Sequence, residues 1–277
     1  MGTLYIVATP IGNLGDMSER ALATLKAVVL IAAEDTRRTR QLLNHFGIQK
    51  PLTSYHAFNE RAKRDELLDA VRLGDVALVT DAGTPGIADP ARDIVRAAID
   101  AGLTVSPIPG ASSLTSAASA SGLIDGPFVM LGFLPRGGRE RRALIGKASA
   151  SGLPFICFES PNRLAETLGD LARALGDREA TVMRELTKLH EEIVGGTLSS
   201  LRDKFAADPP RGEIVLVVAG PGDEAQASDD DAEEIVRRLL ASGMKASDAA
   251  REAASMTGLP RSDLYAIAQR LKTEQRR

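Results

Sequence analysis

Residues 80–90, with the sequence TDAGTPGIADP, bring two glycines, two threonines and two aspartates into one short segment. This segment contains no basic residue, and it lacks both the G-x-G-x-x-G and the G-K-[ST] patterns of phosphate-binding loops. Its backbone amides, hydroxyls and carboxylates suit a ligand with hydroxyl groups, a primary amine or another cationic centre. We therefore expect a small-molecule site here that does not hold a polyphosphate.

The residues on either side of this loop predict a strand before it and a helix after it. Val76–Val79 is short, apolar and β-branched at both ends, which is typical of a buried strand. Pro90 is expected at the first helical position, and apolar residues then recur at helical spacing, at Ile94, Val95, Ala98 and Ile99. Open α/β sheets bind ligands at the carboxyl ends of their strands, and the loop is expected at such an end.

Strands and helices alternate over roughly the first 120 residues. Ser18 is expected to cap a helix that runs to about Lys26. Further strands are expected at residues 4–8, 28–32 and 104–108, and further helices at residues 37–46 and 59–73. This alternation predicts a parallel, doubly wound α/β domain over residues 1–122.

The second half predicts another α/β domain, over residues 123–222, after a hinge at residues 121–127. Strands are expected at residues 128–131, 154–158, 180–185, 192–194 and 213–219, and helices at 139–150, 162–175 and 199–206. The last two strands lie closer together than the strands of the first half, which favours a mixed sheet.

The end of the chain differs in kind from the two α/β domains. Residues 223–231 are polar and acidic and are expected to form a linker. Residues 232–277 contain three short helical stretches, at 232–241, 246–256 and 261–273, and resemble a helix-turn-helix module. From Ile235 onward, nine Lys or Arg stand against four Asp or Glu. The alternative is a helical cap that stabilises only the fold or a dimer.

Composition excludes several classes of protein. The 277 residues carry a net charge of −3, which argues against indiscriminate coating of nucleic acid. The single cysteine, Cys157, excludes an internal disulfide and is expected to be a buried hydrophobe. His45, His56 and His190 are far apart, so no metal site is expected. The chain shows neither a membrane span nor a secretory pattern, and a cytoplasmic location is expected.

Basic residues nevertheless gather in three groups. The first contains Arg136, Arg139, Arg141, Arg142 and Lys147, with only Glu140 opposing them; the second Arg37, Arg38 and Arg40; the third Arg61, Lys63 and Arg64. Each group alone is compatible with a solvated helix face. Three such groups in an acidic protein favour a polyanionic partner.

Several segments resemble the tetrapyrrole-methylase superfamily of S-adenosylmethionine-dependent methyltransferases. They are residues 4–16, 80–90 and 109–113. Four shorter segments, DAGTPG at 81–86, GFLP at 132–135, FESPNR at 158–163 and RELTK at 184–188, are similar to the branch that methylates a cytidine ribose in 16S-type ribosomal RNA. The likeness covers about residues 3–222, and the helical module also suits this branch.

The resemblance implies two α/β domains with S-adenosylmethionine in the cleft between them, and a homodimer. The residues that it assigns to the cofactor are Pro10, Asp81, Ala82, Gly83, Thr84, Ser113, Leu114, Phe158, Leu186 and Gly212. The chain departs from the tetrapyrrole enzymes at residues 9–16, where their G-x-G-P-G-D is replaced by TPIGNLGD. This departure argues against a large macrocycle as substrate and favours the ribosomal branch.

Apart from the resemblance, the residue types also suit methyl transfer from S-adenosylmethionine to a ribose hydroxyl. S-adenosylmethionine carries a sulfonium, an ammonium, a carboxylate and a ribose diol, and it has no phosphate. Transfer of its methyl group is an in-line displacement to which positioning contributes much. A ribose hydroxyl is a weak acid, so a base or a cation beside it would help. Glu185 and Lys188 are the candidates; Glu159, Arg163 and Arg37 are rivals, and a surface salt bridge is the alternative for the first pair.

We therefore expect methylation of a cytidine ribose 2′-hydroxyl in small-subunit ribosomal RNA, free or within the assembled subunit. Arg136, Arg139, Arg141 and Arg142 are the expected RNA contacts. One alternative is a methyltransferase of a porphyrinoid or of a protein side chain, and another is an RNA-binding assembly factor without catalysis. Because aromatic residues make up only 4% of the chain, shape and phosphate contacts must carry most of the recognition.

Overall fold

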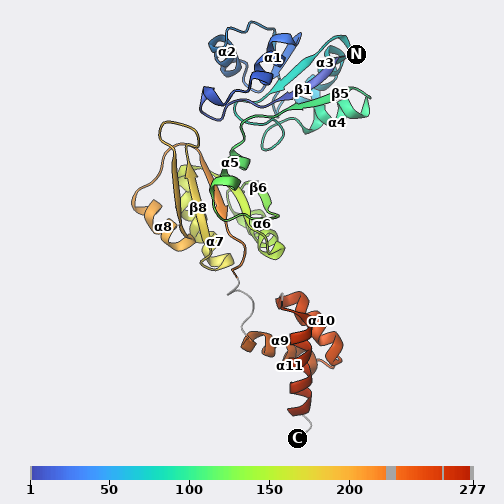
Figure 1. The fold of residues 1–277 in the computed structure, drawn as a ribbon, viewed down its shortest axis with the longest axis vertical. Coiled ribbons are helices and arrows are strands. Elements are labelled where there is room, and N and C mark those ends of the chain that lie inside the picture. The colour runs from blue at the N-terminus through green and yellow to red at the C-terminus, as the bar shows by residue number, and fades with distance from the viewer. Residues whose placement is uncertain (1, 223–228, 258, 275–277) are drawn as a thin grey trace.

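The computed structural model describes residues 2–222, 229–257 and 259–274 (Figure 1). Two five-stranded sheets, each with its own helices, occupy residues 3–218, and three further helices occupy residues 229–274. In Figure 1 the three groups follow one another along the long axis, from the blue N-terminal sheet to the red C-terminal helices.

The first sheet is entirely parallel, as expected. Its strands are β3 (Leu52–Ser54), β2 (Leu30–Ala33), β4 (Val76–Val79), β1 (Thr3–Val7) and β5 (Thr104–Ile108), in this spatial order. The bounds of β4 and β5 match the sequence prediction. The sequence did not indicate β3, because this edge strand has three residues, all half-buried, and therefore no apolar alternation.

Helices cover both faces of this sheet. α1 (Glu19–Ala27) and α2 (Thr36–His45) pack on one face, and α3 (Glu60–Leu73) and α4 (Arg92–Asp100) on the other. Side chains of β1 alternate between the two, with Leu4 and Ile6 in one core and Val7 in the opposite one. The predicted cap of α1 is confirmed, since the Ser18 hydroxyl accepts a bond from the Ala21 amide at 3.2 Å.

The predicted start of α4 was wrong. Pro90 lies before the helix, which begins at Arg92 with Ala91 as its N-cap residue. Ala91 has φ −170° and ψ −25°, and its methyl group is buried in the core of the first sheet. Proline at residue 90 suggested that the helix would begin there. Ala91 is instead buried in the core with a non-helical backbone, and the helix begins one residue later, at Arg92.

The second sheet is mixed, which confirms the expectation. Its order is β6 (Val129–Phe133), β7 (Phe155–Glu159), β10 (Ile214–Val218), β8 (Glu179–Arg184) and β9 (Glu192–Thr197). β6 and β7 are parallel, and the other pairs are antiparallel. Side chains on one face pack against α6 (Gly138–Ser151), α7 (Leu164–Leu175) and α8 (Leu198–Ala207). Cys157 lies in this core and is buried, as expected.

The opposite face of the second sheet is covered by α5 (Ser113–Ala120), a helix that the sequence did not predict and whose residues were expected in the first domain. Leu114 and Ala117 of α5 pack with Ile156, Met183 and Val217 of the second sheet. A division at residue 122 therefore separates this helix from the sheet on which it packs. We propose that the boundary between the two α/β units lies at residues 109–112 instead.

The last three helices form a cluster with its own core. α9 (Asp229–Ala241), α10 (Ala246–Thr257) and α11 (Arg261–Glu274) bury Val236, Ala250 and Leu264 among one another. Residues 223–228 of the expected linker lie outside the described residues, and residues 229–231 belong to α9 rather than to a linker. No described helix has the length and hydropathy to cross a membrane.

Candidate active site between the two sheets

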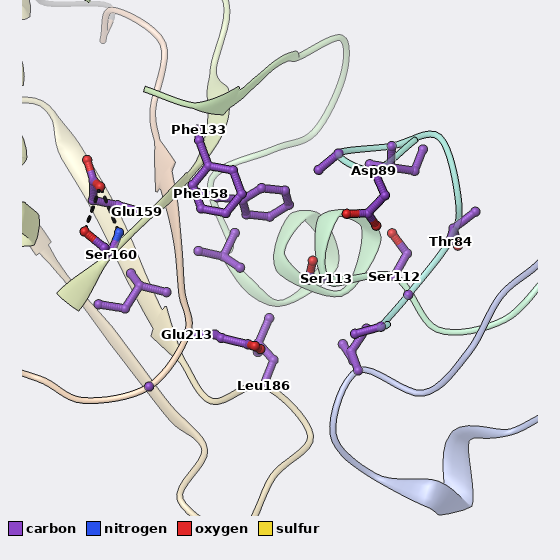
Figure 2. A pocket seen from close by; sticks show the side chains of 18 of the residues that line it. Thr84, Asp89, Ser112, Ser113, Phe133, Phe158, Glu159, Ser160, Leu186 and Glu213 are labelled. Carbon is purple, nitrogen blue, oxygen red and sulfur yellow. Dashed lines mark hydrogen bonds between the residues drawn. The ribbon is translucent and has the colours of Figure 1, made fainter. Parts of the chain in front are cut away.

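A cavity of about 370 Å³ lies between the two sheets. One wall consists of loops that follow strands of the first sheet, and the other of strand ends and loops of the second (Figure 2). Its lining contains hydroxyls, backbone groups, apolar side chains and three carboxylates, and no basic side chain of the described residues contributes to it.

Hydrogen bonds fasten together the three loops that form the first wall. The amides of Thr9 and Gly83 each donate to the other residue's carbonyl, at 2.9 and 3.0 Å. The Thr84 hydroxyl donates to the carbonyl of Ala111 at 3.2 Å. These contacts join the loops after β1, β4 and β5 into one surface. Gly83 makes its bridge with φ +80°, where a Cβ would lie 3.3 Å from Ile11 Cγ2, so this position favours glycine.

Two aromatic rings dominate the second wall. Phe133 and Phe158 lie with ring centroids 5.4 Å apart and face the cavity in Figure 2. Phe158 is buried, whereas Phe133 is 65% exposed and offers its surface to a ligand. Leu186 and the Glu213 side chain complete this wall below the rings.

A buried ionic network supports this wall from behind. Glu159 ends β7, and its carboxylate is 1% exposed. It accepts bonds from the Thr167 hydroxyl at 2.6 Å and the Ser160 amide at 2.8 Å, and it pairs with Arg163 at 3.4 Å and Arg141 at 3.8 Å. Because it accepts hydrogen bonds from Thr167 and Ser160 and lies beside two arginines, Glu159 positions the turn that follows β7 and is a poor candidate for a catalytic base.

Arg141 belongs to this network, which corrects its assignment as an RNA contact. Its guanidinium is 6% exposed and bonds Asp170 Oδ2 at 2.8 Å, Thr167 Oγ1 at 2.9 Å and the carbonyl of Pro135 at 3.1 Å. The helical spacing of α6 turns Arg141 toward α7 and leaves Arg139 and Arg142 exposed on other faces. Arg136, in the loop before α6, is exposed as well.

Seven of the ten residues that the resemblance assigned to the cofactor line the cavity: Ala82, Gly83, Thr84, Ser113, Phe158, Leu186 and Gly212. Pro10 and Asp81 line an adjoining cavity instead. Leu114 belongs to α5 and packs against the second sheet. The assignment missed Asp89, Ser112, Phe133 and Glu213, although Asp89, Ser112 and Phe133 lie within segments that carried the resemblance.

The adjoining cavity has a volume of about 240 Å³ and a different chemical character. It shares Ile11, Ala82 and Glu213 with the first cavity, and it adds two cations, Arg38 and Lys188. Arg38 pairs with Asp81 Oδ2 at 3.2 Å. The second cavity therefore contains two cations, each paired with a carboxylate, whereas the first cavity has no basic side chain among the described residues.

Lys188 reaches this second cavity from the loop after β8. Its ammonium donates to Glu185 Oε1 at 2.9 Å and to Glu213 Oε2 at 3.0 Å. The loop turns through two non-glycine residues in the left-handed region, Glu185 with φ 53° and Thr187 with φ 67°. Such backbone strain concentrates at functional sites.

These contacts set the charges of the pair. Desolvation lowers the pKa of Lys188, but its bonds to Glu185 and Glu213 outweigh this effect, and the pKa lies above its ordinary value. The Glu213 amide and then Lys188 lower the pKa of Glu185. At neutral pH the group is thus an ammonium held by two carboxylates, a cation rather than a base.

Asp89 faces the first cavity from the far end of residues 80–90 (Figure 2). Burial and then the nearby carboxylates of Glu34 and Asp81 raise its pKa to about 6. The Asp35 amide donates to Asp81 Oδ1 at 3.0 Å, so the acidic ends of β2 and β4 meet at one edge of the sheet. The cluster of Glu34, Asp81 and Asp89 therefore favours a positively charged group of a ligand in the first cavity.

The two arginine rivals for catalysis do not line either cavity. Arg37 is 87% exposed and pairs with Asp35 at 2.8 Å. Arg163 donates to the carbonyls of Leu134 and Pro135 at 3.1 and 3.0 Å and thereby holds the loop that follows Phe133. No cluster of potential metal ligands occurs among the described residues.

Comparisons with known proteins agree with this geometry. The model of the tetrapyrrole (corrin/porphyrin) methylases matches residues 3–202, and the model of the RsmI C-terminal HTH domain matches residues 226–272. A ribosomal RNA small subunit methyltransferase I from Synechocystis is 46% identical over 99% of this chain and 100% of its own length. One from Mesorhizobium japonicum is 48% identical over 95% of this chain and 90% of its own length.

Solved structures share the fold at lower identity. Uroporphyrin III C-methyl transferase from Thermus thermophilus is 18% identical, with a TM-score of 0.55 over 78% of this chain and 97% of its own. A putative diphthine synthase from Entamoeba histolytica is 18% identical, with a TM-score of 0.58 over 81% and 95%. The chain belongs to the tetrapyrrole methylase family, and within it to the group of the ribosomal RNA small subunit methyltransferases I.

Proposed function

We propose that this protein transfers a methyl group from S-adenosylmethionine to a cytidine ribose 2′-hydroxyl of small-subunit ribosomal RNA. The observation that carries the proposal is the pair of adjoining cavities, one without basic side chains and one with Arg38 and Lys188. Full-length likeness to ribosomal RNA small subunit methyltransferases I supports the choice of substrate.

The residues of the first cavity fit S-adenosylmethionine. Thr84, Ser112 and Ser113 offer hydroxyls to polar groups, and Asp89 offers a carboxylate to a cationic one. Phe133 and Phe158 offer apolar faces to a planar ring. No arginine or lysine of the described residues lines the cavity, so it offers no partner to a phosphate chain. This absence suits S-adenosylmethionine, because that cofactor has no phosphate.

The chemistry divides between the two cavities. When bound, S-adenosylmethionine supplies a methyl group already activated by a positively charged sulfur. Lys188 would then stabilise negative charge on the ribose oxygen while the hydroxyl proton passes to solvent water. Glu185 holds Lys188 in place and is itself a weak base, since its pKa is lowered.

Recognition of the RNA requires positive charge away from these cavities. Arg136, Arg139 and Arg142 are exposed at the start of α6 and make no salt bridge among the described residues. We assign them to phosphate contacts, whereas the network around Glu159 retains Arg141.

Two further features belong to the same proposal. We infer a homodimer, which a molar mass of about twice 29.3 kDa in light scattering would support. The proposed substrate also places the protein in the cytoplasm.

The test uses purified protein, S-adenosylmethionine with a tritiated methyl group, and small ribosomal subunits from a strain that lacks this enzyme. We expect tritium in the RNA and 2′-O-methylcytidine in its nuclease digest by mass spectrometry. Methyl transfer to a base, or to ribosomal protein alone, would contradict the proposal. Parallel assays with free RNA distinguish the two forms of the substrate.

A further inference from the structure

Phe58 is 98% exposed, the most exposed of the large hydrophobic side chains in the described part of the chain. Apolar residues scattered over a surface need no special explanation. Phe58, however, combines this exposure with a hydrogen-bonded turn and a position on the ligand-binding edge of the first sheet, where helices with arginines in their first turns also begin.

The turn that carries Phe58 is well ordered by hydrogen bonds. The Asn59 side chain accepts from the His56 amide at 2.8 Å and donates to the carbonyl of Ser54 at 3.2 Å. The amides of Asn59 and Glu60 both donate to the carbonyl of His56, at 2.9 and 3.0 Å. The His56 ring lies edge-on to the Phe58 ring at 6.0 Å between centroids. The turn therefore fixes the backbone from which the aromatic ring projects into solvent.

This turn follows the carboxyl end of β3. The strand order β3-β2-β4 puts the end of β3 two strands from the end of β4, which carries residues 80–90. At about 4.8 Å between neighbouring strands, the two strand ends are about 10 Å apart. Phe58, four residues beyond the end of β3, thus belongs to the same edge of the sheet as residues 80–90.

Four arginines lie in the first turns of α2, α3 and α4, which all begin at the same edge of the sheet. Arg37 and Arg38 lie in the first turn of α2, Arg61 in the first turn of α3, and Arg92 opens α4. Arg61 and Arg92 are exposed and make no salt bridge among the described residues, and Glu60 is the acidic residue in the first turn of α3. An exposed aromatic ring at an edge that also carries Arg61 and Arg92 suits an unpaired base with its flanking phosphates.

We propose that Phe58 stacks on an unpaired base of the RNA substrate and thereby positions the strand that enters the Lys188 cavity. Arg61 and Arg92 contact the phosphates on either side of that base. This inference rests on the proposed function and adds to it a defined path for the RNA, along the carboxyl edge of the first sheet.

The experiment compares Phe58→Ala, Phe58→Trp and Leu73→Ala. Leu73 is a matched control, because it is 91% exposed and ends the same helix α3 at the opposite edge of the sheet. With small ribosomal subunits as substrate, Phe58→Ala should raise the KM about 5- to 150-fold, the range for loss of one stacked base. The kcat and the affinity for S-adenosylmethionine should stay within about twofold. Phe58→Trp should retain the wild-type KM, since it preserves the aromatic face, and so should Leu73→Ala.

A second measurement keeps this test separate from the proposed function. Binding of a single-stranded RNA oligonucleotide that contains 2-aminopurine reports stacking directly, as quenching of its fluorescence. Quenching by the wild type and Phe58→Trp, but not by Phe58→Ala, supports the platform even if no methyl transfer is observed. Equal KM and equal quenching for wild type and Phe58→Ala would overturn it. A change in molar mass of Phe58→Ala would also overturn it, because it would identify Phe58 as a contact between copies of the chain.

Discussion

The side chain of Lys188 lies directly over Gly12, so that a Cβ on Gly12 would overlap its methylene groups. Gly12 belongs to the loop after β1 and Lys188 to the loop after β8, so this contact joins the two halves of the molecule. The backbone of Gly12 has φ +151°. Glycine at residue 12 therefore leaves room for the ammonium to reach Glu185 and Glu213.

We predict that Gly12→Ala lowers kcat by displacing Lys188, and that Lys188→Met lowers it by about 10²-fold through loss of the cation. Neither change should alter the affinity for S-adenosylmethionine, because Lys188 lies outside the first cavity. Gly47→Ala is the control, since Gly47 also has positive φ and its Cβ would meet open space. Single-turnover rates with saturating cofactor measure the effect, and a wild-type rate in Lys188→Met would remove Lys188 from the mechanism.

We predict that Gly83→Val abolishes binding of S-adenosylmethionine. Its side chain would crowd Ile11 and break the bridge between Thr9 and Gly83 that shapes the first wall. Gly102→Val imposes similar backbone strain at φ +69°, but in open space and away from the cavity, so it should bind normally. Calorimetric titration decides the matter, and unchanged affinity in Gly83→Val would contradict this location of the cofactor.

Arg141 and its exposed neighbours should behave in opposite ways. Arg141→Gln should lower the free energy of unfolding by about 3–5 kcal/mol, because it leaves Glu159 and Asp170 without their buried partner. Removing the charges of Arg136, Arg139 and Arg142 should change stability by about 0.5 kcal/mol or less each. It should instead flatten the salt dependence of RNA binding by about 0.7–0.9 in logarithmic slope per lost phosphate contact. Urea unfolding tests the prediction for Arg141, and salt titrations of RNA binding test the prediction for the exposed arginines. An unchanged slope of the salt dependence would show that Arg136, Arg139 and Arg142 form only a solvated surface.

The stability of the protein should depend on pH through Asp89. Because folding raises its pKa to about 6, the folded state favours the protonated carboxyl. The resulting stability is present below the unfolded pKa near 4 and is lost as pH rises through about 6. Asp89→Asn should thus be more stable than wild type at pH 7, on the order of 1 kcal/mol after allowance for solvent screening, and equal to it at pH 4. Thermal unfolding of both proteins at pH 4 and pH 7 measures this difference in stability. If the variant and the wild type differed equally at the two pH values, Asp89 would not be the source of the pH dependence.

The C-terminal helices should act in substrate binding rather than in chemistry. They have their own buried core, and neither described cavity between the sheets includes a residue from them. Truncation after Asp223 should leave a folded protein with normal affinity for S-adenosylmethionine and a raised KM for its RNA substrate, because a tethered module with surplus positive charge from Ile235 onward raises the local concentration of RNA. Full activity would show that the module is dispensable, and an unfolded product would show that it is a structural cap.

Much of the molecule follows from the sequence alone, because its signals are local. Strand β4 is a continuous apolar run between polar segments, and Ser18 caps α1 through a bond three residues away. The residue types of the loop at residues 80–90 indicate the kind of ligand it binds, since the loop combines carboxylates with small residues and lacks basic ones. Position in a strand–loop–helix unit then places this loop at a ligand-binding edge.

Other features depend on partners that lie far away in the chain, and only the tertiary structure decided them. In the sequence Arg141 resembles its basic neighbours. In the fold it is buried and pairs with Glu159 and with Asp170, which lies 29 residues away in the chain. α5 follows the first sheet in the chain, yet its apolar face fits the second. Lys188 acquires its surroundings from Gly12 and Glu213 together. Burial and charge pairing are properties of the folded surface, and residues of the same type therefore take on different roles according to what the fold places beside them.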